Sequence, residues 1–179
     1  MIDINQIQNP CREDKVIDAC SIFGVMDTSG NRFSGDGVIT AITNMHERGN
    51  GLGGGFAIYG LYPEYAELYA FHVMYLSQEG KRQTEAFLKE KFRVVFKEEV
   101  PTRPTRGIIN PPLVWRYFLE LDKRKLNGQS EDDYVVDRVM EINTKLQDAF
   151  VYSSGKNMGV FKGVGYPEEI ADYFCLEQY

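Results

Sequence analysis

The sequence predicts an α+β protein, in which short strands and amphipathic helices are mixed along the chain. Apolar and β-branched runs bounded by Gly, Pro, Asn or Asp recur, as expected of strands. Between them lie stretches whose apolar residues repeat every three or four positions, as expected of helices. The chain has 179 residues and 43% hydrophobic content, enough to bury a substantial core in one large or two small domains.

The first predicted element is a strand at Cys20–Met26, an apolar run that opens on a thiol. It ends at the turn-forming residues 27–31, Asp-Thr-Ser-Gly-Asn. Beyond this turn, Val38, Ile42 and Met45 share one face at helical spacing, which predicts a helix over residues 37–45. His46 follows at the helix end, where we expect capping or packing rather than catalysis.

A glycine-dense loop comes next, with glycines at positions 49, 51 and 53–55. Glycine accepts positive φ and lets backbone or ligand approach closely. A phosphate-binding loop is rejected, because the Lys-Ser/Thr of a P-loop is missing and the glycines follow a helix rather than precede one. Residues 55–61 then predict a second strand.

The middle of the chain, residues 62–148, predicts a separate unit. Strands are expected at residues 69–76, 93–98, 113–121 and 150–153. Helices are expected at residues 80–92 and after Ser130, which with Asp133 suggests an N-terminal capping box. The order βαβ followed by βαβ indicates a ferredoxin-like, split-βαβ unit.

The last part of the sequence predicts two strands within residues 149–163, joined by residues 154–157. A helix over residues 168–176 should follow, because Pro167 suits a first helical turn and two glutamates stand near its N-terminus.

Composition excludes several classes of function. A net charge of −6 and a pI near 5.0 argue against a nucleic-acid surface. Three scattered cysteines and two histidines suggest neither a disulfide framework nor a zinc site, so no metal or cofactor is expected. Residues 1–19 lack the apolar core of a secretory signal, and no run is long enough to span a bilayer. A cytoplasmic protein without a membrane partner is therefore predicted.

Three motifs together resemble a known family: Cys20-x-Ile-Phe-Gly, a helix ending in Arg48-Gly49, and Gly53-x-Gly-Phe-Ala. This succession is similar to the opening of class II glutamine amidotransferases, which are N-terminal-nucleophile hydrolases. The nearest likeness is to the amidotransferase part of glutamate synthase, where a Ser-Ser-Gly…Met…Lys pattern like that of residues 153–162 also occurs.

The resemblance implies a partial αββα hydrolase sandwich formed by residues 20–61 and 149–179, with residues 62–148 as the ferredoxin-like insertion. It also implies that residues 1–19 are a leader, or propeptide, removed by cleavage between Ala19 and Cys20. From the residues alone, a flexible tail or a strand-like lead-in is the alternative.

Cys20 is the one catalytic residue that the resemblance assigns, whereas Cys11 and Cys175 are expected to be packing residues. Once freed, Cys20 would carry both a thiol nucleophile and an α-amino group, whose ordinary pKa of about 7.7–8.0 suits a general base. Such a residue would hydrolyse glutamine through a thioester and release ammonia. Arg48 belongs to the Arg-Gly motif, and we expect it to have a structural role.

The family's oxyanion-hole Asn-Gly pair and its substrate-binding Arg are expected downstream, but the sequence ends at Tyr179, where that stretch should begin. Asn127-Gly128 lies in the predicted insertion, and a turn is expected there. Three explanations remain open: a shortened piece of a longer chain, a split enzyme, or a fragment without catalysis. On its own the chain should have little glutaminase activity.

Two functions from different classes follow. In the first, the protein is a glutaminase component that takes glutamine as substrate and works with a synthase subunit or a missing C-terminal half. In the second, it is a non-catalytic interaction or regulatory subunit that uses the ferredoxin-like unit, whose strand edges would pair with a partner. Exposed apolar edges would also favour self-association into a homo-oligomer. An intact mass that lacks residues 1–19 would favour the first function, and the full-length mass the second or an unprocessed precursor.

Overall fold

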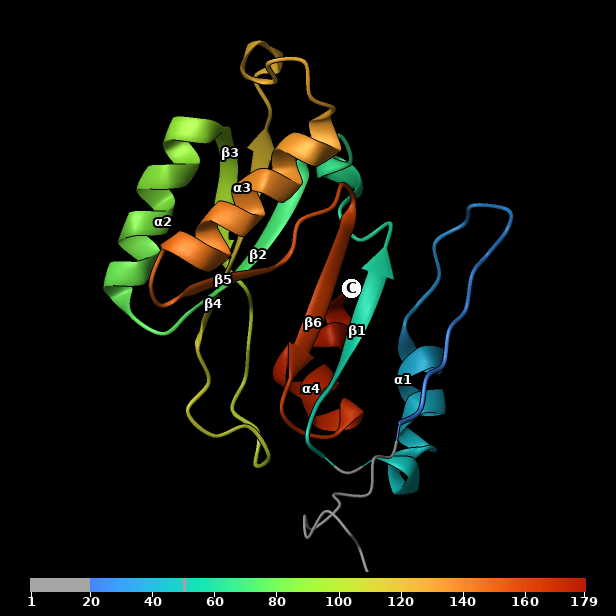
Figure 1. The fold of residues 1–179 in the computed structure, drawn as a ribbon. Helices are drawn as coiled ribbons and strands as arrows, with labels where there is room; N and C mark the ends of the chain where they lie inside the picture. Colours follow the sequence, from blue (N-terminus) through green and yellow to red (C-terminus); the bar gives the residue numbers. More distant parts are fainter. Residues whose placement is uncertain (1–19, 50) are drawn as a thin grey trace, which may run out of the picture.

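A computed structural model of the protein describes residues 20–49 and 51–179. The predicted leader, together with Cys11, lies outside these residues. The prediction of an α+β fold is confirmed, because the described chain forms two antiparallel sheets with helices packed against them (Figure 1).

The larger sheet has four strands in the order β3-β4-β2-β5. Its strands are β2 (Tyr69–Tyr75), β3 (Arg93–Glu99), β4 (Leu113–Glu120) and β5 (Ala149–Ser153). The helices α2 (Gln78–Lys91) and α3 (Glu131–Lys145) lie side by side on one face of this sheet (Figure 1). The element order β2-α2-β3-β4-α3-β5, with β4 between β2 and β3, is the connectivity of a split βαβ motif.

Local sequence explains where both helices begin. Ser77 and Ser130 occupy the N-cap positions, and their side chains accept hydrogen bonds from the backbone N–H groups of Gly80 and Asp133. Strand β2 is buried along almost its whole length, because the helices cover one face of the sheet and the smaller sheet's layer covers the other. Short 3₁₀ helices complete the chain: η2 (His46–Arg48), η3 (Pro63–Tyr65), η4 (Lys123–Lys125) and η5 (Leu176–Gln178).

The smaller sheet pairs β1 (Gly54–Tyr59) with β6 (Met158–Gly163), two strands that lie about a hundred residues apart in the sequence. The helices α1 (Asp36–Thr43) and α4 (Pro167–Tyr173) pack beside it (Figure 1). Although β5 and β6 follow one another in the chain, they belong to different sheets. Sheet membership therefore places β5 with the four-stranded unit, which extends through Ser153.

The strand predicted at Cys20–Met26 is wrong. Residues 20–26 form neither helix nor strand, and Ile22 and Met26 are 91% and 80% exposed. A strand needs a neighbour that accepts and donates its backbone hydrogen bonds, and within the described residues this segment has none. Apolar content alone thus did not suffice to form the element.

A buried polar network ties the two sheets together. His72 on β2 is fully buried; its Nδ1 lies 2.9 Å from the carbonyl oxygen of Val160 on β6, and its Nε2 lies 2.7 Å from the Tyr62 hydroxyl. Because the carbonyl can only accept, Nδ1 carries the proton and Nε2 accepts from Tyr62. Arg116 on β4 continues the network by donating to Glu98 and to the Tyr179 hydroxyl, both at 2.7 Å.

Across the described part of the chain, no helix combines the length and the apolar character needed to cross a membrane.

Candidate functional site

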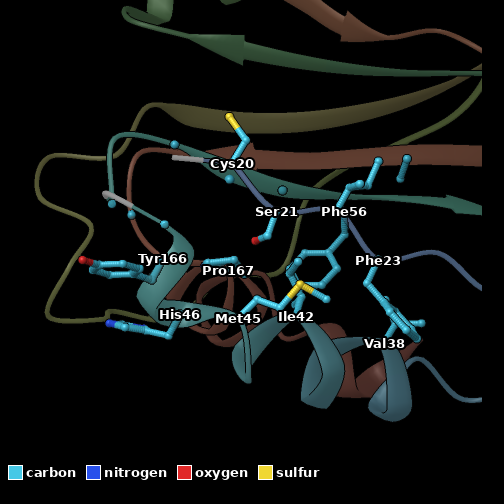
Figure 2. Close-up of a pocket in the computed structure, with 18 residues that line it drawn as sticks. Cys20, Ser21, Phe23, Val38, Ile42, Met45, His46, Phe56, Tyr166 and Pro167 are labelled. Atoms are coloured by element: carbon cyan, nitrogen blue, oxygen red, sulfur yellow. The ribbon is translucent and has the colours of Figure 1, made fainter. Parts of the chain in front are cut away.

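Cys20 is exposed and stands at the edge of a cavity of about 390 Å³. Figure 2 shows its Sγ directed away from α1, on the opposite side of the chain from the Ser21 hydroxyl. The thiol is therefore open to solvent rather than enclosed in side-chain packing. A cavity of this size lies within the range of small-molecule sites.

Helices and a strand supply much of the cavity lining. One side of the cavity is apolar and is lined by Val38 and Ile42 of α1 and by Met45, which follows this helix. Strand β1 contributes Phe56, and the start of α4 contributes Pro167 (Figure 2). The helical spacing of Val38, Ile42 and Met45 is the same pattern that predicted α1 from the sequence.

The glycine loop forms another wall of this cavity, since Gly49, Gly51 and residues 53–55 line it. Gly51 adopts φ +70°, a left-handed conformation that favours glycine over other residues. The structure therefore brings Cys20 and the glycine loop, which were singled out separately in the sequence, to one cavity. Arg48 is exposed and is not among the residues that line the cavity.

His46 packs against an aromatic ring and forms a hydrogen bond at the far end of the cavity. It lies in η2 rather than in α1, and its Nδ1 is 2.5 Å from Oε1 of Glu168 on α4. Its ring stacks on Tyr166 with a centroid separation of 3.8 Å and an interplanar angle of 20°. Packing is the role that the sequence favoured for this histidine, and its partners are now identified.

Tyr166 and Glu168 were missed by sequence reasoning. They lie more than a hundred residues from His46 in the chain, and their local pattern indicates only the start of a helix. Asn127-Gly128 forms a turn with φ +49° and +88°, as predicted, and has no part in the cavity. A second Asn-Gly pair, Asn50-Gly51, lies in the glycine loop; Gly51 lines the cavity, while Asn50 lies outside the described residues.

The lining defines what the site can do chemically. Its described residues present an accessible thiol, the backbone of a glycine loop, apolar side chains and the polar side chains of Ser21, His46 and Tyr166, and they include no Lys, Arg, Asp or Glu. A lining of this kind suits a neutral group better than a fully charged one.

Cys175, the other cysteine among the described residues, adds no further site. Cys175 is buried and adopts φ +52°, as a small packing residue at the start of η5. Within residues 20–49 and 51–179, no three metal-ligating side chains lie close enough to hold an ion.

The fold and the site thus define a mixed α+β protein with an accessible cysteine at the edge of a glycine-walled cavity. An uncharacterized protein of the archaeon Archaeoglobus fulgidus is 56% identical to this chain over 168 residues. The match covers 92% of this chain but only 44% of the relative, so the chain spans less than half of that protein's length. No protein-family model matches the chain.

Proposed function

We propose that this protein is the nucleophile-bearing part of a class II glutamine amidotransferase of the N-terminal-nucleophile type. The observation that carries the proposal is the exposed Cys20 thiol at the edge of the cavity walled by the glycine loop. The succession of Cys20, Arg48-Gly49 and Gly53-x-Gly-Phe-Ala supports it, because residues of all three motifs line one cavity. The split βαβ unit would correspond to a ferredoxin-like insertion into the hydrolase sandwich.

In the proposed reaction, the α-amino group of a freed Cys20 removes the thiol proton as the sulfur attacks the side-chain carboxamide of glutamine. A C–S bond forms and the C–N bond breaks, so that ammonia leaves with a proton returned from the amine. A γ-glutamyl thioester remains on Cys20. Water then cleaves the thioester to give glutamate and the free thiol.

The leader controls this chemistry. While residue 19 is attached, the nitrogen of Cys20 is part of an amide, which is not a base at neutral pH. Removal of residues 1–19 would therefore create the base and the nucleophile in one step. Cleavage between Ala19 and Cys20 acts as the on-switch in this proposal.

Further polypeptide is needed to complete the site. Among its described residues the cavity lining includes no Lys or Arg for the substrate's α-carboxylate. Ile22 in this lining is 91% exposed, and Met26 and Tyr59 in the lining of the neighbouring cavity are 80% and 79% exposed. The archaeal relative extends well beyond the shared region, since the match covers 44% of its length. We propose that a polypeptide segment like the additional part of the relative, or a synthase subunit, covers these apolar side chains. The same polypeptide would supply the groups that bind the oxyanion and the substrate's α-carboxylate. Without it, the same surface would favour self-association.

The test measures ammonia release from L-glutamine by protein that begins at Cys20, alone and together with the part of the archaeal relative outside the shared region. Activity is expected only in the combined preparation, and Cys20→Ala should abolish it. Cys175→Ala is the matched control, because that thiol is buried away from the cavity, and it should leave the rate unchanged.

Equal rates for Cys20→Ala and the parent protein would exclude the proposed nucleophile. No ammonia from any preparation would favour the other function class, a non-catalytic interaction subunit built on the split βαβ unit.

A further inference from the structure

The glycine loop rests on the aromatic ring of Tyr166. A Cβ atom added at Gly51 would lie 3.1 Å from Cε2 and 3.3 Å from Cζ of this ring, and one added at Gly49 would lie 3.6 Å from Cδ1 and Cε1. Two observations therefore favour glycine at position 51: its φ of +70° and its close contact with the Tyr166 ring. The loop could not approach this closely with larger residues.

Tyr166 is itself held from several directions. Its backbone N–H donates to Oε2 of Glu169 at 3.0 Å, and Pro167 at the first turn of α4 restricts the chain that follows. The His46 ring stacks on its ring at 3.8 Å. His46 is fixed in turn by Glu168, at 2.5 Å from Nδ1 to Oε1. The ring is therefore held in place by groups from both η2 and α4.

Residues 51–53 lie outside any helix or strand, between η2 and the start of β1 at Gly54, so contacts with Tyr166 can help to order them. Glycines carry no side chains that could anchor the loop elsewhere, and they lose much conformational entropy when they are ordered. Contact with a fixed aromatic ring limits the positions that the loop can take.

From these contacts we infer that Tyr166 is a positioning residue, which holds the glycine loop against the substrate side of Cys20. The inference rests on the proposed function, because it names what the loop is positioned for: the carboxamide that the sulfur attacks. Backbone N–H groups beside a nucleophile stabilise the oxygen of an acyl substrate only when they are held in place before the reaction. Tyr166 also lines the cavity, and its contribution in this inference is to order the loop.

The inference predicts a selective effect. Loss of the ring should slow the reaction of Cys20 with a glutamine-shaped reagent, which must fit against the loop. It should not slow the reaction with a small reagent that needs only the exposed thiol. A merely structural role for Tyr166 would change both rates alike.

The experiment compares Tyr166→Leu, which removes the ring but keeps apolar bulk, with Tyr166→Phe, which keeps the ring. Protein that begins at Cys20 is combined with the part of the archaeal relative outside the shared region. The mixture is treated either with iodoacetamide or with an L-glutamine analogue whose carboxamide is replaced by a diazoketone. Alkylation of Cys20 is followed by mass spectrometry. Hydrogen exchange of the amides of residues 51–55 is measured on the same samples.

For Tyr166→Leu we expect analogue labelling to slow by at least about tenfold, since small misplacements of reacting groups have large effects on rate. Iodoacetamide labelling should change by less than about twofold, because this small reagent needs only the exposed thiol and no fit against the loop. Amide exchange of the loop should accelerate. Tyr166→Phe should match the parent in all three measurements.

The inference about Tyr166 would be overturned if Tyr166→Leu changed both labelling rates in parallel or left the amide exchange of the loop unaltered. Neither result would affect the proposed function. A parent protein that reacts with the L-analogue no faster than with its D-enantiomer would overturn the proposed function as well, so the two failures are distinguishable.

Discussion

The buried histidine between the two sheets leads to a pH prediction. Burial lowers the pKa of His72 from 6.5 to about 4; the hydrogen bond to the Val160 carbonyl opposes this shift, and the Arg116 charge adds to it. Folded protein therefore keeps His72 neutral at pH values where the unfolded chain has already bound a proton. The free energy of unfolding should consequently fall as the pH drops from 6.5 towards 4, and be independent of this residue above about pH 7.5.

The magnitude follows from the two pKa values. With a His72 pKa of 6.5 in the unfolded chain and about 4 in the folded protein, the free energy of unfolding should fall by about 1.5 kcal/mol between pH 6.5 and 5.0. Carboxylates contribute little in this window, because their ordinary pKa values lie near 4. The chain has only two histidines, so few other groups titrate there. Urea unfolding at half-unit pH steps measures the effect.

His72→Gln should remove this slope, because glutamine can occupy the network without titrating. His46→Gln is the matched control: it changes the other histidine, which is outside the buried network, and should leave the His72 contribution intact. Parallel pH curves for His72→Gln and the parent would refute the assigned protonation state.

Two further predictions concern packing and the edge of the larger sheet. Leu88→Ala should lower the free energy of unfolding by about 2–5 kcal/mol, because the fully buried side chain leaves a cavity under α2. Urea unfolding measures this loss, with Lys89→Ala at an exposed position of the same helix as the control. Equal free energies of unfolding for the two variants would contradict the prediction. Asn143→Ala should cost about 1–3 kcal/mol and speed amide exchange at Val151, because Asn143 bonds both the N–H and the carbonyl of that residue. Unchanged exchange at Val151 would show that these bonds do not protect the strand.

Elements formed by local signals could be predicted from the sequence. Helix α3 begins after Ser130 as expected, because an N-cap serine acts on residues only a few positions away. Strands β2 and β4 were also expected near their observed positions, since their β-branched and aromatic content favours strands. In these cases, short-range preference and the final fold agree.

Elements that depend on distant partners could not be predicted. The run at Cys20–Met26 has strand-like composition, yet it forms no strand, because pairing depends on a neighbour that composition does not reveal. The stack of His46 on Tyr166 joins residues far apart in the sequence, and neither residue's surroundings indicate the other. Cys20 was singled out by its motif, whereas its position beside the glycine loop required the fold.

The role of the Cys20 amino group is the central claim, and the rate of glutamine hydrolysis before and after removal of residues 1–19 tests it most directly. Both forms, at the same protein concentration, would be combined with the part of the archaeal relative outside the shared region and assayed for ammonia release. Because positioned general acid–base catalysis contributes about 10²–10⁴-fold, the form that begins at Cys20 should be at least about 100-fold faster. Equal rates from the two forms would contradict the account, since the amide nitrogen of the uncut chain cannot serve as the base.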